Sequence, residues 1–233
     1  MSSIQVNLER VIASIRDAEA KAGRKEGSVA LLAVSKFHPR ESVLDAIAAG
    51  QARFGENRVQ EAFEKFSGMQ ELHPHVALHI IGALQRNKAA KAVSVASCVE
   101  SIDRLEIISE LEKHCAKINK SIQIFFEYHT GEATKSGFET YDALCEAVQF
   151  CADGNAPHLV PSGFMTMAPF TDDEKKVRAS FVMLREVAQK LRAQFPSLPL
   201  TELSMGMSGD YRIAIEEGAT QVRIGTAIFG ARA

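Results

Sequence analysis

The sequence lacks the features that mark membrane, secreted and nucleic-acid-binding proteins. It contains no run of about 18 apolar residues, so no membrane-spanning helix is expected. Its first residues show no unbroken apolar core of the kind that a signal peptide carries. Lysine and arginine number 27 against 29 acidic residues, for a formal net charge of -2, so neither nucleic acid nor an anionic membrane is an expected partner. These absences favour a cytoplasmic globular protein.

Cysteine is scarce, and its spacing matches no redox or zinc motif. The four cysteines form no Cys-x-x-Cys pair and lie within apolar stretches, at Cys98, Cys115, Cys145 and Cys151. Small thiols in apolar surroundings are common in protein cores. We therefore expect reduced, structural cysteines.

The chain alternates short apolar runs with amphipathic helices. An N-terminal helix is predicted over residues 1–23, where apolar residues recur at helical spacing: Ile4, Leu8, Val11, Ile12 and Ile15. Eight runs then predict strands, at residues 29–34, 53–57, 78–82, 98–102, 122–128, 159–165, 201–205 and 221–225. Eight strand–helix units indicate an α/β fold, a closed (β/α)8 TIM barrel forming one domain over residues 1–233. A doubly wound open sheet is the alternative, and Pro161 makes the sixth strand the least regular.

Capping residues predict where two of the helices begin. Asp103 followed by Glu106, and Thr171 followed by Glu174, have the spacing of a capping box. We therefore expect one helix to begin after Asp103 and another after Thr171.

Lys36 directly follows the first apolar run, in Ala33-Val34-Ser35-Lys36. In a (β/α)8 barrel the active face lies at the carboxyl ends of the strands, so functional residues end strands or begin the following loops. Side chains alternate along a strand, so Lys36 shares a face with Val34. Poor solvation at the edge of an apolar barrel disfavours an ammonium ion and favours a neutral amine that can attack an aldehyde. The alternative is a lysine on the barrel rim with its charge in solvent.

The loops after the last two strands have the composition of a phosphate-binding cradle, and in such barrels these two loops commonly bind phosphate. Two glycines allow close approach of backbone N–H groups and three hydroxyls add donors: Gly206, Gly225, Ser204, Ser208 and Thr226. Ser208 is also expected to begin a helix, whose dipole favours an anion. The alternative is that these residues only make tight turns. A phosphate site opposite a Schiff-base lysine would fit a phosphorylated aldehyde.

Arg223 and Asn57 are two further polar residues near strand ends. Arg223 lies two residues before Gly225, so its guanidinium could reach the barrel mouth, where a charge needs a partner. That partner is either Glu56 or Glu100, or else a ring nitrogen of a ligand. Asn57 follows the second strand and could donate a hydrogen bond to a ring substituent.

Three other features carry weaker predictions. His79 begins the third strand and is predicted to be a hydrogen-bonded core histidine. His73 and His75 have the spacing of a metal pair, but no third ligand is near in the sequence, and no metal site is predicted. The polar loop over residues 132–137 could be a lid or a second contact for phosphate.

Five motifs in register resemble the pyridoxal phosphate homeostasis protein family. They are AVSK at residues 33–36, FGENRVQE at 54–61, HIIGALQRNK at 79–88, SMGMSGD at 204–210 and RIGTAIFG at 223–230. The resemblance runs in the family's order from about residue 5 to the end of the chain. It implies a single-domain barrel of the alanine racemase type, without the second β domain of that enzyme.

The resemblance also implies residue roles toward pyridoxal phosphate. Lys36 would carry the cofactor as a Schiff base, Arg223 would contact the pyridine nitrogen, and Asn57 would lie near the ring. The phosphate would be held by Ser204, Ser208, Gly225 and Thr226. One segment departs from the pattern: similar proteins show Gln-x-Asn in the fifth strand, where this chain has Phe126-Glu127-Tyr128.

Two arguments favour a cofactor carrier or regulator in vitamin B6 and amino-acid homeostasis over a dedicated enzyme. An arginine cannot protonate the pyridine nitrogen, so the cofactor would be a weaker electron sink, although alanine racemase also uses arginine there. Two-base racemisation also needs a second acid–base group opposite the lysine, and none of Tyr128, Tyr141 and Tyr211 has a clear claim to that place. A single-domain amino-acid racemase and a Schiff-base aldolase acting on a phosphosugar remain the alternatives. We expect a monomer, with apo-enzymes as possible recipients of the cofactor.

Overall fold

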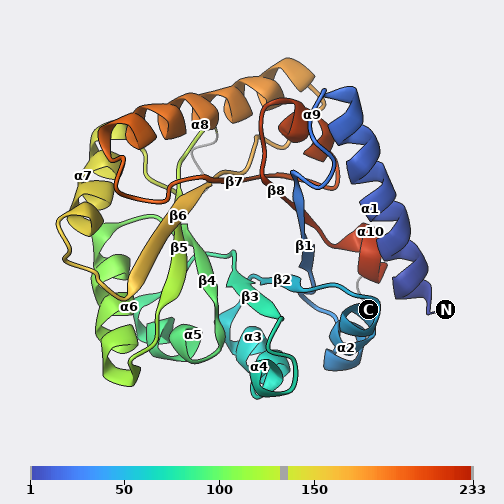
Figure 1. Cartoon of the computed structure of the whole chain (residues 1–233), viewed down its shortest axis with the longest axis horizontal. Helices are drawn as coiled ribbons and strands as arrows, with labels where there is room; N and C mark the ends of the chain where they lie inside the picture. Colours follow the sequence, from blue (N-terminus) through green and yellow to red (C-terminus); the bar gives the residue numbers. More distant parts are fainter. Residues whose placement is uncertain (1, 132–135, 232–233) are drawn as a thin grey trace.

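The computed structural model describes residues 2–131 and 136–231 and shows an eight-stranded parallel β-barrel surrounded by helices (Figure 1). The strands follow one another around the barrel in chain order, and the last strand closes it by pairing with the first. The predicted barrel is confirmed, and the open-sheet alternative is wrong because an open sheet would leave these two strands unpaired.

Every predicted strand is present, with bounds that agree within two residues. The strands are β1 (Ala30–Val34), β2 (Arg53–Glu56), β3 (Ala77–Ile80), β4 (Cys98–Ile102), β5 (Ile122–Glu127), β6 (Leu159–Met165), β7 (Glu202–Met207) and β8 (Gln221–Ile224). The helices are α1 (Ser3–Lys21), α2 (Arg40–Ala48), α3 (Val59–Phe66), α4 (Met69–Leu72), α5 (Ala89–Val95), α6 (Leu105–Ile118), α7 (Tyr141–Ala152), α8 (Glu174–Gln194), α9 (Tyr211–Glu216) and α10 (Thr226–Phe229), with a 3₁₀ turn, η1 (Arg86–Lys88), before α5. Among the described residues, no helix is both long and apolar enough to cross a bilayer.

The N-terminal helix α1 packs on the outside of the barrel beside α9 and α10 (Figure 1). It begins after Ser2, whose hydroxyl accepts a hydrogen bond from the Gln5 amide. The predicted apolar face is buried, except that Ile12 is 38% exposed. The helix therefore covers the join between the last and the first strand.

Both predicted capping boxes are wrong. The Asp103 carboxylate accepts a hydrogen bond from the neighbouring Arg104 guanidinium, and α6 begins without a side-chain cap. At α8 the capping residue is Asp173, which accepts from the Lys175 amide, while Thr171 accepts from Asp173 one turn earlier. Competing local partners thus displaced the expected caps.

Strand β6 is complete but irregular at Pro161, as predicted. Ile124 of β5 lies opposite Pro161 and Phe125 opposite Gly163, so one extra residue of β6 is accommodated as a bulge. Proline has no N–H to donate to the ladder, so the pairing shifts where it occurs.

The barrel has an apolar outside and a partly polar inside. Apolar strand residues facing the helices join one large buried cluster, whereas Cys98, Phe125 and Met165 form a separate small cluster. Among the buried polar side chains, five from four strands are joined by hydrogen bonds: His79, Glu100, Ser204, Gln221 and Arg223. Barrel interiors are usually filled by branched apolar residues. One member of this polar group, Arg223, also lines the cavity at the carboxyl ends of the strands.

Candidate functional site

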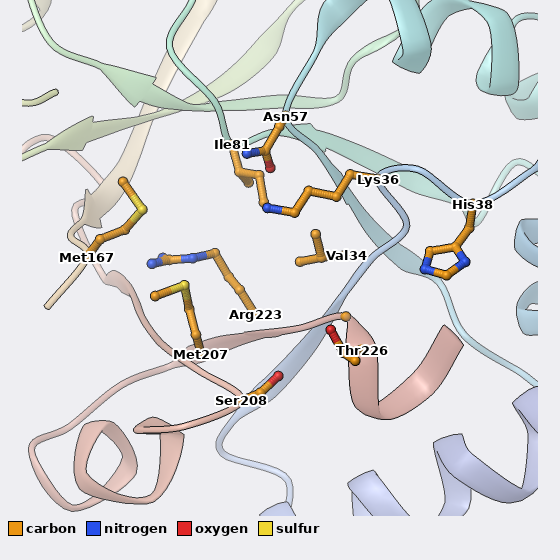
Figure 2. A pocket seen from close by; sticks show the side chains of 11 residues that line it. Val34, Lys36, His38, Asn57, Ile81, Met167, Met207, Ser208, Arg223 and Thr226 are labelled. Atoms are coloured by element: carbon orange, nitrogen blue, oxygen red, sulfur yellow. The ribbon is translucent and has the colours of Figure 1, made fainter. Parts of the chain in front are cut away.

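A cavity of about 200 Å³ lies at the carboxyl ends of the strands (Figure 2). It is lined by Val34, Lys36, His38, Asn57, Ile81, Met167, Met207, Ser208, Arg223, Gly225 and Thr226. Six of the eight site residues predicted from the sequence are among them. Most of the lining belongs to residues that end strands or directly follow them, which is where these barrels hold their active sites.

Lys36 is the second residue after β1, and Figure 2 shows its side chain extended into the cavity that Val34 and Asn57 also line. Strand β1 is buried along most of its length, so it holds the start of the following loop rigidly. Lys36 is therefore the primary amine that the barrel presents to a small molecule in the cavity.

The hydroxyls of Ser208 and Thr226 lie across the cavity from Lys36 (Figure 2). Gly225 stands beside them, where a Cβ atom would come within 2.9 Å of the Val34 carbonyl oxygen. Only glycine therefore allows β8 to approach β1 so closely at this point. One detail differs from the sequence prediction: Ser208 lies in the turn before α9, with Asp210 at the helix start.

Ser204 and Gly206 are not among the residues that line the cavity, and the phosphate-binding role expected for them stays a prediction. The strand was predicted to end at residue 205, but β7 continues to Met207, which places Ser204 two residues deeper in the barrel. The Ser204 hydroxyl donates to Glu100 at 2.6 Å and accepts from Arg223 at 2.8 Å. Gly206 has a φ of 95°, and a Cβ there would come within 2.6 Å of the Ala214 side chain. Gly206 is thus required for packing of α9 on β7.

Arg223 is 4% exposed and is held by oxygen atoms of strand β7 and of the residue that follows β6. Its guanidinium donates to the Ser204 carbonyl and hydroxyl and to the Thr166 carbonyl, at 2.6–2.8 Å. It therefore pairs directly with neither of the two glutamates expected from the sequence. Burial lowers the pKa of Arg223, against the attraction of Glu100 and Glu127, but a guanidinium remains charged at neutral pH. The cavity thus has a fixed positive charge opposite Met167 (Figure 2).

Glu100 is the centre of the polar network below the cavity. This fully buried carboxylate accepts hydrogen bonds from His79 at 2.5 Å, from Ser204 and from Gln221. Burial alone would raise the pKa of Glu100, but the His79 hydrogen bond and the charge of Arg223 hold it below its ordinary value. His79 is a buried, hydrogen-bonded histidine, as predicted. The carboxylate balances the arginine through the Ser204 hydroxyl.

One group of described residues has ligand atoms close enough together to hold a metal ion: His79, Cys98 and Glu100. Burial raises the pKa of the Cys98 thiol well above its ordinary value, which disfavours the thiolate that binds metals. His79 and Glu100 are already hydrogen-bonded to each other. We assign this group to the structural network and not to a metal centre.

Residues 6–233 match the family model of the alanine racemase N-terminal domain. Two curated relatives, both named pyridoxal phosphate homeostasis protein, align with the whole chain. The one from Vibrio cholerae is 42% identical over 237 residues, and the one from Escherichia coli is 37% identical over 244, with 98% of each relative covered. The chain belongs to the pyridoxal phosphate homeostasis protein family. The family resemblance drawn from the five motifs is confirmed.

Solved structures agree with this membership. PipY of Synechococcus elongatus, solved with pyridoxal phosphate bound, is 34% identical with a TM-score of 0.84, covering 97% of this chain and 100% of PipY. Alanine racemase from Streptomyces coelicolor is 16% identical with a TM-score of 0.72, and 58% of that chain is covered. The second likeness shows a shared fold alone.

Strand β5, where the sequence departs from the expected Gln-x-Asn pattern, adds a buried carboxyl near Arg223. Phe126 packs outside the barrel, and the next residue, Glu127, is 2% exposed and accepts hydrogen bonds from the Ser136 hydroxyl. Burial raises the pKa of Glu127 to about 7, although Ser136 and Arg223 act in the opposite direction. Sequence reasoning missed this group.

Glu127→Gln is expected to remove a pH dependence of stability. A carboxyl whose pKa is raised by folding stabilises the protein fully below its unfolded value of 4.5, and this contribution is lost as the pH rises through 7. The variant should therefore gain up to roughly 3 kcal/mol over the wild type between pH 4.5 and pH 8. Urea unfolding at both pH values measures this gain. The control is Glu139→Gln, at an exposed glutamate. An equal pH dependence of the free energy of unfolding for wild type and Glu127→Gln would refute the prediction.

Two other lining residues could have been found from the sequence. His38 follows Lys36 by two residues, so alternation along the chain points to it, and Met167 follows the end of β6. The predicted lid at residues 132–137 is not tested, because residues 132–135 lie outside the described residues.

Proposed function

We propose that this protein binds pyridoxal 5'-phosphate in the cavity, with Lys36 bonded to it as a Schiff base, and acts as a carrier or regulator in vitamin B6 and amino-acid homeostasis. The observation that carries the proposal is the placement of one lysine amine opposite two hydroxyls and a glycine in one cavity, in a chain of this family. The Lys36 amine would form a C=N bond with the aldehyde carbon, and one water molecule would leave.

The lining fits the cofactor in size and in chemistry. A cavity of about 200 Å³ is below the roughly 300–1,000 Å³ of sites for drug-sized ligands, which suits a molecule with a single ring. Ser208, Thr226 and the Gly225 backbone would hold the phosphate, and Asn57 would contact a ring substituent. Arg223 would face the ring nitrogen. Ile81 and Met207 supply apolar contacts for a flat ring.

Arg223 favours the carrier role over a dedicated enzyme. When bound, pyridoxal phosphate supplies an electron sink for reactions of amino acids, and the sink is strongest with a protonated ring nitrogen. Arg223 keeps its charge and its hydrogen bonds to Ser204 and Thr166, so it has no proton to give to that nitrogen. We propose that the protein acts in the cytoplasm as a monomer, with one domain over residues 1–233. Apo-enzymes would be the recipients of the cofactor.

Titration of the purified protein with pyridoxal phosphate tests the proposal. We expect the visible absorbance of a Schiff base, saturating at one cofactor per chain. Pyridoxal, the same aldehyde without the phosphate, should bind at least roughly 100-fold more weakly, because it loses the hydrogen bonds of Ser208 and Thr226, at about 1.5–3 kcal/mol each. Equal affinity for the two aldehydes would show that Ser208 and Thr226 do not hold a phosphate.

Two further outcomes would favour the alternative functions. Deuterium exchange at the α-carbon of an added amino acid, at saturating cofactor, would support a racemase. Borohydride trapping of a phosphosugar on Lys36 would support an aldolase.

A further inference from the structure

The loop that carries Lys36 is held by a buried ion pair that does not line the cavity. Helix α3 follows β2, and two of its residues one turn apart, Glu61 and Lys65, form an ion pair at 2.7 Å. Lys65 is only 7% exposed, which is unusual for a lysine. A buried ammonium needs a specific set of partners, and one of them is the carbonyl of Ser35, the residue immediately before Lys36.

The backbone is tied to α3 immediately before and immediately after Lys36. The Lys65 ammonium donates to the Ser35 carbonyl at 2.7 Å, and the Phe37 amide donates to the Glu61 carboxylate at 2.5 Å. Lys36 is therefore the one residue between two anchored neighbours. This arrangement restricts the direction in which its side chain can leave the backbone.

The conformation of Phe37 shows that this stretch of backbone needs support. Its φ is 67°, in the left-handed region, which costs a residue with a bulky side chain roughly 1–3 kcal/mol. Its ring is 40% exposed, so burial of the ring compensates only in part. The hydrogen bond from its amide to Glu61 stabilises the strained conformation.

Glu56, the last residue of β2, also takes part in this set of contacts with Lys65 and Ser35. Its Oε1 atom accepts from the Ser35 hydroxyl at 2.7 Å and from Lys65 at 2.9 Å, so the three N–H donors of Lys65 have three acceptors. Burial raises the pKa of Glu56, against the effects of Lys65 and Ser35, and its Oε2 atom has no hydrogen-bond partner among the described residues.

We propose that Lys65 and Glu61 are positioning residues for Lys36, which fix the backbone on both of its sides so that its amine meets the aldehyde of the ligand in one orientation. The inference rests on the proposed function. It assigns to helix α3 a role in the reactivity of the Lys36 amine, through contacts of Lys65 and Glu61 with the residues on either side of Lys36. Misplacement of a reacting group by about 1 Å can slow a reaction roughly 100-fold.

The test compares the rate constant for Schiff-base formation with pyridoxal phosphate among single variants. Lys65→Met should react roughly 10- to 100-fold more slowly than the wild type. Lys65→Arg, which keeps the charge and the donors, should recover part of the rate. The matched control is Lys91→Met, because Lys91 also contacts α3, through Gln60 and Phe63, two residues that are not part of the Glu61–Lys65 ion pair.

A second variant and a second readout separate positioning from general stability. Glu61→Gln removes the ion pair at nearly constant shape, with Glu64→Gln on the exposed side of the same helix as its control. In Lys65→Met and Glu61→Gln, hydrogen exchange of the peptide covering residues 35–38 should accelerate at least tenfold, while the controls keep the wild-type rate.

The outcomes are distinct. A folded Lys65→Met protein with the wild-type rate and wild-type exchange would overturn the inference. If Lys65→Met does not fold, Glu61→Gln decides by the same two measurements. If the wild type forms no Schiff base, the proposed function fails. The positioning role can still be tested in that case, because unchanged hydrogen exchange at residues 35–38 in the variants would show that Lys65 and Glu61 do not hold this backbone.

Discussion

Lys36→Ala is expected to abolish covalent attachment of pyridoxal phosphate completely. The residue supplies the amine that Figure 2 shows extended into the cavity, and alanine has no nucleophile to replace it. The phosphate cradle of Ser208, Gly225 and Thr226 is unchanged in the variant. Weak, reversible binding should therefore persist without the absorbance of a Schiff base. The measurement is the visible spectrum during titration, followed by borohydride reduction and mass spectrometry of the peptides.

Two controls make the loss interpretable. Lys88→Ala, at an exposed lysine after β3, should keep the wild-type spectrum. Lys36 lies outside the strands and is part-exposed, so Lys36→Ala should unfold within about 0.5 kcal/mol of the wild type. A Lys36→Ala protein that retains the same covalent chromophore would show that another amine carries the cofactor.

The barrel could be predicted from the sequence because parallel strands buried on both faces are short continuous apolar runs. The run at residues 29–34 is an example, and β1 covers all but one of its residues. The ends of strands were the hardest feature to predict, because the change from apolar to polar residues does not always coincide with the end of the strand. Strand β7 continues through Gly206 to Met207, two residues beyond the predicted end, so Ser204 lies within the strand and donates to Glu100 in the barrel interior.

The cavity could be predicted in part, because the rule about strand ends needs only local information. Lys36, Asn57 and Gly225 each follow a recognisable strand. The network beneath them could not be predicted, since His79, Glu100, Ser204 and Gln221 come from four different strands and meet only when the barrel closes. Glu127 was missed for a related reason. Its raised pKa comes from burial, which depends on strands from distant parts of the chain closing around it.

Glu100→Ala is expected to cause the largest loss of stability among the substitutions considered. The carboxylate accepts hydrogen bonds from His79, Ser204 and Gln221 and offsets the buried charge of Arg223. Removal of one partner from a buried charge pair costs about 3–5 kcal/mol, because the remaining groups stay buried without compensation. Glu100→Gln keeps the shape and one acceptor oxygen and should lose less, roughly 1–3 kcal/mol.

Urea unfolding at pH 7 measures these losses, with Glu106→Ala as the control at an exposed glutamate of α6. The pH dependence gives an independent check. The pKa of Glu100 lies below its ordinary value of 4.5 in the folded protein, so its stabilising contribution is present above 4.5 and is lost as the pH falls through the folded value. The difference between wild type and Glu100→Gln should therefore narrow below pH 4.5. A loss under about 1 kcal/mol for Glu100→Ala at pH 7 would mean that Arg223 is held by Ser204 and Thr166 without help from this carboxylate.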